Sequence, residues 1–116
     1  MVTNYERGRN FEYRVKRFFE KLGYFVVRSA GSHSPCDLVC IKPDLSSFCS
    51  CVRLVQCKYG ESKMSKKEEK KFREFCNELF ASGYIAVTDK NGHIRFRYMQ
   101  DITDDEAEIY ARQVEE

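Results

Sequence analysis

The stretch DLVCIKPDLSSFCSCVRLVQCK (37–58) decides the fold of this chain. It contains two segments with strand character, DLVCIK (37–42) and FCSCVRLVQCK (48–58). The loop PDLSS (43–47) that joins them is too short for the crossover connection that parallel strands need. We therefore expect the two segments to pair as an antiparallel hairpin.

Three polar side chains lie at one end of this predicted hairpin. Asp37 opens the first strand, and Gln56 and Lys58 close the second. Side chains two residues apart on a strand point to the same face, so the amide and the ammonium share a face. The antiparallel pairing then brings the carboxylate of Asp37 to the same end of the hairpin.

The rest of the chain alternates between helical and strand patterns. Apolar residues at helical spacing predict a helix over 5–22 that ends at Gly23, and a second helix over about 65–82 that ends at Gly83. Further strands are predicted at 24–30, 84–89 and 93–99, the last two joined by the Asn-Gly turn KNG (90–92). An acidic third helix is predicted from Thr103.

The predicted order is αβββαββα, which indicates an α/β domain with a mixed five-stranded sheet flanked by helices. Within the second helix, the residues expected to face inward are Phe72, Phe75, Cys76, Leu79 and Phe80. The length of 116 residues predicts a single domain, 1–116, with 101–116 as its acidic C-terminal helix.

Composition excludes several classes of protein. No apolar run is long enough to span a membrane, and the N-terminal segment lacks the apolar centre of a signal peptide. The six cysteines form no CxxC pair, and most lie in apolar strand-like segments, which predicts free thiols in a reducing compartment. We therefore expect a cytoplasmic or otherwise intracellular protein. A metal site formed by Cys36, Cys40, Cys49 and Cys51 is the alternative.

Charge is distributed unevenly along the chain. Residues 1–100 contain 19 Lys and Arg against 11 Asp and Glu, a net charge of +8, whereas 101–116 contain one against seven, a net charge of −6. A basic body favours a polyanion as partner, although scattered lysines can also serve solubility alone. Five lysines lie in the segment KMSKKEEKK (63–71), at the start of the second predicted helix.

The polar group of the hairpin fits metal-assisted hydrolysis of a phosphodiester. Mg²⁺ prefers oxygen ligands, which the Asp37 carboxylate, the Gln56 amide and the backbone carbonyl of Cys57 would supply. Lys58 would orient or deprotonate the attacking water. Glu12, one residue from the apolar stripe of the first helix, would hold metal-bound water or a second ion. On spacing alone, a solvated sheet end with paired charges is the alternative.

The succession RGRNFEYRVKRFFEKLGYFVVRSAGSHSPCDLVCIK (7–42), followed by VQCK (55–58), resembles the archaeal-type Holliday junction resolvases of the PD-(D/E)xK nuclease superfamily. The likeness continues more loosely to Met99. The matching features are Gly8, Glu12, Arg14, the segment VRSAGS (27–32), Asp37 and Lys58. These features occur together and in the family's order, which makes the likeness specific.

This resemblance implies a restriction-endonuclease-like fold and a homodimer that cuts four-way DNA junctions symmetrically with Mg²⁺, for which Mn²⁺ would substitute. The catalytic residues that it implies are Glu12, Ser32, Asp37, Gln56 and Lys58. The implied metal ligands are Glu12, Asp37, Gln56 and the Cys57 carbonyl. The implied DNA contacts are Arg7, Arg9, Arg14, Arg28, Lys63, Lys66, Lys67 and Lys70. An archaeal, bacterial or viral context fits such an enzyme.

Gln56 departs from the family pattern, which usually has glutamate at this position. An amide keeps an oxygen ligand but removes one negative charge, so the affinity for metal should fall. The QxK motif also resembles that of the Mrr-like restriction endonucleases, which accept glutamine at this position. The alternatives are therefore an Mrr-like restriction or repair endonuclease acting on duplex DNA and a DNA-binding relative that does not cleave.

Overall fold

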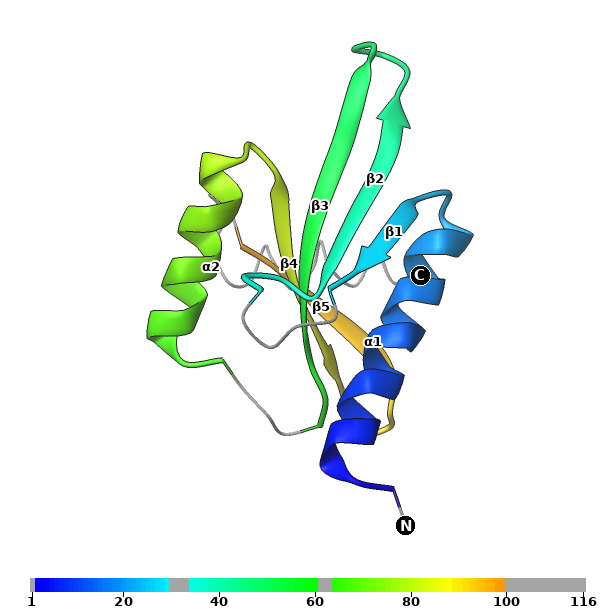
Figure 1. The fold of residues 1–116 in the computed structure, drawn as a ribbon, viewed down its shortest axis with the longest axis vertical. Helices are drawn as coiled ribbons and strands as arrows, with labels where there is room; N and C mark the ends of the chain where they lie inside the picture. The colour runs from blue at the N-terminus through cyan, green and yellow to red at the C-terminus, as the bar shows by residue number, and fades with distance from the viewer. Residues whose placement is uncertain (1, 30–33, 61–63, 100–116) are drawn as a thin grey trace.

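The computed structural model describes residues 2–29, 34–60 and 64–99 and contains a mixed five-stranded sheet with a helix on each side (Figure 1). In chain order the elements are α1 (Asn4–Lys21), β1 (Phe25–Arg28), β2 (Leu38–Asp44), β3 (Cys49–Lys58), α2 (Lys66–Glu78), β4 (Ser82–Thr88) and β5 (Ile94–Tyr98). The predicted fold class and order are confirmed up to β5. The predicted helix from Thr103 lies outside the described residues.

The strands lie in the sheet in their sequence order, β1-β2-β3-β4-β5. β2 pairs with β3 in antiparallel register, with Leu38 opposite Val55 and Asp44 opposite Cys49, so the predicted hairpin is confirmed. This hairpin extends well beyond the other strands in Figure 1. β3 and β4 are parallel, and α2 forms the crossover between them. The pairing with β2 stops at Val55, and the last residues of β3, Gln56, Cys57 and Lys58, pair with β4.

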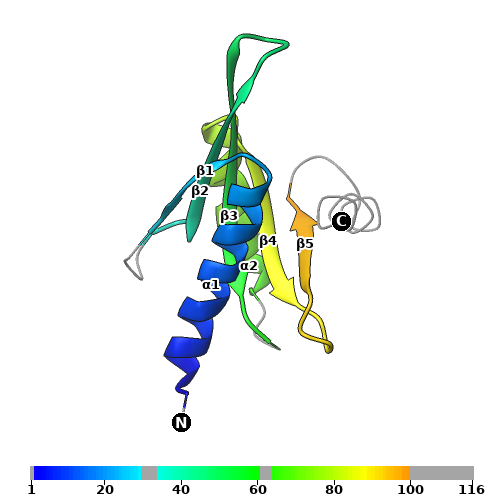
Figure 2. The ribbon, with the colours of Figure 1, turned by 90° about the vertical axis from the view of Figure 1, so that its right-hand side faces the viewer.

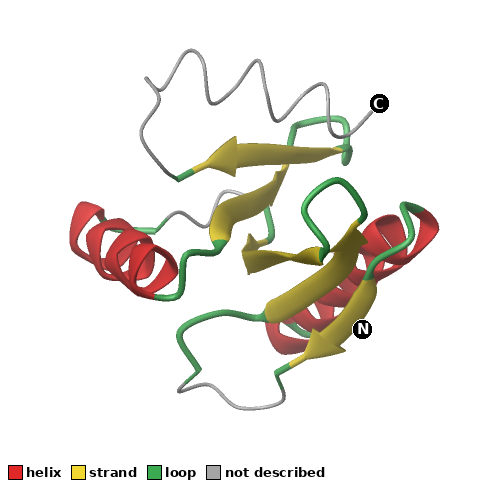
Figure 3. Ribbon diagram, turned by 90° about the horizontal axis from the view of Figure 1, so that it is seen from above, coloured by secondary structure: helices red, strands yellow, loops and turns green. Residues whose placement is uncertain are grey.

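α1 covers one face of the sheet, as the views in Figures 2 and 3 show. The Thr3 side chain caps its first turn by accepting a hydrogen bond from the Glu6 amide at 3.1 Å. The buried residues Phe11, Val15 and Phe19 form its apolar stripe and belong to one core cluster with strand residues such as Val55. This packing places the polar residues beside the stripe at the edge of the sheet.

α2 lies on the opposite face, where Phe72 and Cys76 are buried against β4. The predicted end of this helix is wrong. Leu79 is its C-cap, and Phe80 follows with φ +53° and 97% exposure, so neither side chain enters the core as predicted. Gly83 is a residue of β4 instead of a helix terminator. The strand needs glycine there because α2 packs so closely on β4.

All six cysteines are free thiols, and Cys36, Cys40 and Cys76 are buried in apolar surroundings. Burial raises the pKa of the Cys40 and Cys76 thiols to about 12, which keeps them protonated at neutral pH. Cys49 is exposed, so the expectation of buried thiols is wrong for that residue. No helix in the described ranges is both long and apolar enough to cross a membrane.

We predict that Gly83→Ala destabilises the fold. An added Cβ would lie 2.6 Å from Cys76 Sγ and 3.4 Å from Met99 Cβ, so α2 would have to move away from β4. Overpacking of this kind costs about 1–3 kcal/mol of the free energy of unfolding. Urea unfolding followed by circular dichroism measures the loss.

Two further variants test the stated cause. Gly8→Ala is the control, because a Cβ on Gly8 meets no atom within 4 Å. Cys76→Ala removes the sulfur that the new methyl group meets, so Gly83→Ala should cost less in that background than in the wild type. Equal losses in the two backgrounds would contradict the steric explanation.

Candidate active site

The backbone of Asp37 is held between two strands just before β2 begins. Its amide donates to the Val55 carbonyl at 2.9 Å, and its carbonyl accepts a hydrogen bond from the Ser29 amide at 2.8 Å. The first bond continues the β2–β3 ladder, and the second continues the β1–β2 ladder. The position of the Asp37 side chain is therefore fixed by the sheet.

The Asp37 carboxylate faces the backbone of β3. Its Oδ2 accepts a hydrogen bond from the Cys57 amide at 2.8 Å. Within a strand, the N–H and C=O groups of one residue point to the same edge, so the Cys57 carbonyl lies on the Asp37 side of β3. This arrangement places a carboxylate and a backbone carbonyl at the end of the hairpin, as predicted.

The two carboxyl groups of the site, Asp37 and Glu12, both have raised pKa values. Burial is the main cause for each, and repulsion from the charge of Asp37 raises the pKa of Glu12 further. The Cys57 amide, Lys58 and Arg28 act in the opposite direction on the pKa of Asp37. Ionising either carboxyl group therefore costs free energy, mainly because both groups are buried.

Glu12 projects from α1 and forms an ion pair with Arg28 of β1. The Arg28 Nε donates to Glu12 Oε1 at 2.9 Å, and each side chain is about four-fifths buried, with 19% and 20% of its surface exposed. The Arg28 guanidinium also lies over the Tyr13 ring, 4.8 Å from its centroid. Arg28 therefore orients Glu12, a contact that the sequence pattern did not predict.

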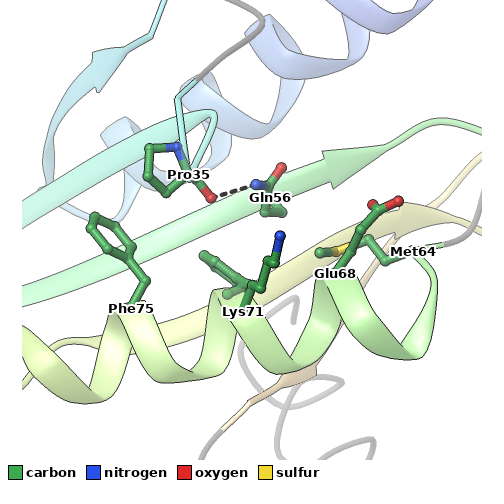
Figure 4. A pocket seen from close by; sticks show the side chains of 7 residues that line it. Pro35, Gln56, Met64, Glu68, Lys71 and Phe75 are labelled. Atoms are coloured by element: carbon green, nitrogen blue, oxygen red, sulfur yellow. Dashed lines mark hydrogen bonds between the residues drawn. The ribbon is translucent and has the colours of Figure 1, made fainter.

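Gln56 lies on the α2 side of β3, and its amide is oriented by the chain before Asp37. Gln56 Nε2 donates to the Pro35 carbonyl (Figure 4). A carbonyl only accepts, so the amino group must face Pro35, and Oε1 points away from it. The amide oxygen is therefore turned in one defined direction, which is what a ligand of a metal ion requires.

A cavity of about 390 Å³ lies beside Gln56, between β3 and α2. Figure 4 shows the lining on the α2 side, in which Lys71 and Glu68 lie between the apolar side chains of Phe75 and Met64. Lys58 Nζ is 3.9 Å from Glu68 Oε2, a loose pair with both groups partly exposed. Lys58 is thus restrained near the site but is not held in a tight ion pair with Glu68.

These donors fit a hard divalent cation, because they are all oxygen atoms: the Asp37 carboxylate, the Cys57 carbonyl and the Gln56 amide. Within the described ranges, no cluster of three His, Cys, Asp or Glu residues could hold a metal ion. This finding gives no support to the alternative of a cysteine metal site.

The basic residues predicted to contact DNA occupy three places. Arg7, Arg9 and Arg14 lie on α1, where Arg9 covers the Tyr5 ring and Arg14 donates to the Gly92 carbonyl at 2.9 Å. Lys66, Lys67 and Lys70 are exposed on the first turns of α2. Arg28 is engaged with Glu12, as described above. Ser32 and Lys63 lie outside the described residues.

A hollow beside the candidate site is not predicted by the sequence pattern. This hollow of about 560 Å³ lies beside Lys58, and its lining includes Arg7, Tyr59 and Gly60. The available signal was an aromatic residue and a glycine directly after the lysine, in QCKYG (56–60). This signal does not predict the hollow, because α1 and β3 meet only in the folded protein.

Comparison with known proteins identifies the family and supports the fold. The family model described as archaeal Holliday junction resolvase (hjc) matches residues 3–115. The solved structure of Archaeoglobus fulgidus Hjc, described as a Holliday junction resolvase from an archaeal hyperthermophile, matches with a TM-score of 0.62 and 21% identity, covering 89% of this chain and 88% of that chain. At this identity the structural match shows the fold. No curated protein matches. Because the family model spans almost the whole sequence, the chain belongs to the archaeal Holliday junction resolvase family.

Proposed function

We propose that this protein is a Mg²⁺-dependent DNA endonuclease that resolves four-way junctions by hydrolysing phosphodiester bonds symmetrically in two strands. The observation that carries the proposal is the Asp37 carboxylate fixed by the Cys57 amide, beside Lys58, in a chain of the resolvase family. The raised pKa of Asp37 marks it as a carboxylate whose ionised form is costly without a cation.

Asp37, the Gln56 amide oxygen and the Cys57 carbonyl would hold the metal, with Mn²⁺ able to replace Mg²⁺. When bound, the ion supplies charge that stabilises the phosphate in the transition state and lowers the pKa of a coordinated water. The residues of the chain then have to place the phosphate and accept a proton. The oriented amide at Gln56 supports this ligand set, because its oxygen faces away from Pro35.

Lys58 is the residue proposed to orient or deprotonate the attacking water. It belongs to β3, two residues from Gln56 on the same face, and its charge reaches Asp37. Glu12 would hold metal-bound water or a second ion, with Arg28 fixing its carboxylate. Ser32 would assist at the scissile phosphate, a role that rests on the family resemblance.

The DNA would lie across the basic residues around this site. Arg7, Arg9, Arg14 and Arg28 would contact phosphates beside α1, and Lys66, Lys67 and Lys70 would do so beside α2. Lys63 is a further proposed contact. Contacts of this kind read the shape of the DNA backbone more than its sequence. Because resolution needs two symmetric cuts, we propose that the enzyme acts as a homodimer inside the cell.

Two other functions compete with this one. An Mrr-like restriction or repair nuclease would use the same site on ordinary duplex DNA. A DNA-binding relative without nuclease activity would use only the basic surface, and the neutral side chain of Gln56 favours this candidate because one ligand charge is missing. Substrate comparison separates all three.

We expect Mg²⁺ to support paired nicks in a synthetic four-way junction, and EDTA to abolish them. Linear duplex of the same length and sequence should be cut at least tenfold more slowly. This ratio corresponds to an activation free energy that is higher by about 1.4 kcal/mol. Denaturing gel electrophoresis with each strand labelled in turn locates the nicks. Equal cutting of duplex would indicate the Mrr-like function.

Asp37→Asn should remove most of the cleavage while leaving the affinity for the junction within a few-fold of the wild type. The asparagine Oδ1 can still accept the hydrogen bond from Cys57, so the fold is kept, but the ligand charge is lost. Lys66→Ala is the contrasting variant, since it should weaken binding with little effect on the rate at saturating enzyme. Unchanged cleavage by Asp37→Asn would refute the site.

Metal binding can also be tested without catalysis. Because the folded-state pKa of Asp37 is raised above its ordinary value of 3.8, its ionisation costs stability as the pH rises through and above that value. In EDTA, the free energy of unfolding of Asp37→Asn should therefore rise relative to that of the wild type as the pH increases from 3 to 7. At pH 7, Mg²⁺ at a hundred times its dissociation constant should stabilise the wild type by about 2.7 kcal/mol and the variant far less.

Gln56→Glu tests the amide directly. The new carboxylate would face the Pro35 carbonyl, so without metal we expect a loss of about 1 kcal/mol in the free energy of unfolding. With Mg²⁺ the added charge becomes a ligand, and the concentration of Mg²⁺ for half-maximal cleavage should fall. Gln56→Ala lacks both groups and should raise that concentration. A rise with Gln56→Glu as well would argue against a ligand at this position.

A further inference from the structure

The hollow beside Lys58 combines two residues with roles proposed above, Arg7 and Lys58, with an aromatic residue and two glycines that have none. It is open to solvent, has a volume of about 560 Å³, and lies where the N-terminal half of α1 meets the end of β3. Two cations, Arg7 and Lys58, line it together with the Tyr59 ring and two glycines, Gly8 and Gly60. The volume falls within the range of small-molecule sites in proteins.

The two glycines keep the hollow open. A Cβ on Gly8 or on Gly60 would meet no atom within 4 Å, so a side chain at either position would project into free space. Gly60 has φ +68°, and its amide donates to the Thr88 hydroxyl at 2.8 Å. This hydrogen bond fixes the chain after Tyr59 to the end of β4, so this wall of the hollow has a defined position.

Tyr59 is an aromatic ring held at the edge of the core. Its centroid lies 5.8 Å from that of Phe11, which is almost completely buried, and the two planes are inclined by 58°. The core contact restrains the ring, yet 42% of the residue stays exposed. A restrained and half-exposed ring is suited to stacking, because little conformational freedom remains to be lost.

The charge of the hollow favours an anion. Arg7 is exposed, and no carboxylate in the described ranges forms an ion pair with it. Lys58 has a loose contact with Glu68 at 3.9 Å and a longer-range electrostatic interaction with Asp37. The two cations lie on the same hollow as the Tyr59 ring, so an anionic group and a flat apolar group are recognised together. A nucleotide unit of DNA combines these two groups.

We infer that this hollow binds one unstacked nucleotide next to the scissile phosphate, with its phosphate between Arg7 and Lys58 and its base on the Tyr59 ring. The inference rests on the proposed function, because Lys58 belongs to both sites. In continuous duplex each base is covered by its neighbours, whereas at a branch point one face of a base can become free. Tyr59 is therefore a residue that selects junctions over duplex.

The experiment is a cycle that removes the ring and the base in turn. Four-way junctions are prepared with an abasic site at each nucleotide that flanks the nick, and their affinities are measured by fluorescence anisotropy in EDTA. At one of these positions, loss of the base should weaken binding by the wild type about tenfold, the size typical of stacking on an aromatic ring. With Tyr59→Ala, the same abasic junction and the intact junction should bind equally.

Control variants separate the ring from other effects. Tyr59→Phe should keep the tenfold effect, and Phe48→Ala should also keep it, because Phe48 is an exposed aromatic at the opposite end of β3. Gly8→Leu should fill the hollow and weaken junction binding without lowering the thermal midpoint, since its Cβ meets no atom. This variant keeps the test decisive if Tyr59→Ala does not fold.

The outcomes distinguish this inference from the proposed function. The hollow is not a nucleotide site if the abasic sites weaken binding equally for the wild type and for Tyr59→Ala and if Gly8→Leu binds junctions fully. This conclusion would hold even if the wild type nicks junctions. Absence of nicking by the wild type with Mg²⁺ would overturn the proposed function, while the binding cycle in EDTA would still report on the hollow.

Discussion

A hydrogen bond between the Cys57 amide and the Asp37 carboxylate joins the two strands that form the site. It exists because Leu38 lies opposite Val55, which brings the residue before β2 level with the end of β3. A slip of one residue in this register would turn every side chain of the strand to the other face of the sheet. It would move Gln56 and Lys58 away from α2 and separate Asp37 from its amide. The candidate chemistry thus depends on the register of one hairpin.

The hairpin was predictable because its evidence is local. A five-residue loop, PDLSS (43–47), between two strand-like segments leaves antiparallel pairing as the geometric solution, and the positions of Asp37 and Lys58 follow from it. The end of α2 was not predictable in the same way. A glycine that follows a helical pattern, such as Gly83, predicts the end of a helix. In the structure Gly83 belongs to a strand, and Cys76 packs against it. That contact belongs to the tertiary structure, as does the pairing of Glu12 with Arg28.

The neutral side chain of Gln56, a proposed ligand, suits its surroundings. A carboxylate in the same place would direct a negative oxygen at the Pro35 carbonyl, whereas an amide satisfies that carbonyl with a donor. The substitution from the family's usual glutamate therefore removes a charge and gains a hydrogen bond. The neighbouring carboxylates, Asp37 and Glu12, already have raised pKa values, so one negative charge fewer also lessens repulsion when no metal is bound.

The parallel pairing of β3 with β4 has a consequence for the order in which the protein folds. Strands β1, β2 and β3 meet their neighbours through short connections, but β4 can join β3 only after the crossover that contains α2 has closed. Contacts between residues distant in sequence form late, since loop closure must precede them. The hydrogen bond from Gly60 to Thr88 is one of these contacts. The carboxylate side of the site can thus assemble in an early hairpin, and the wall beside Tyr59 is completed by the last steps of sheet formation.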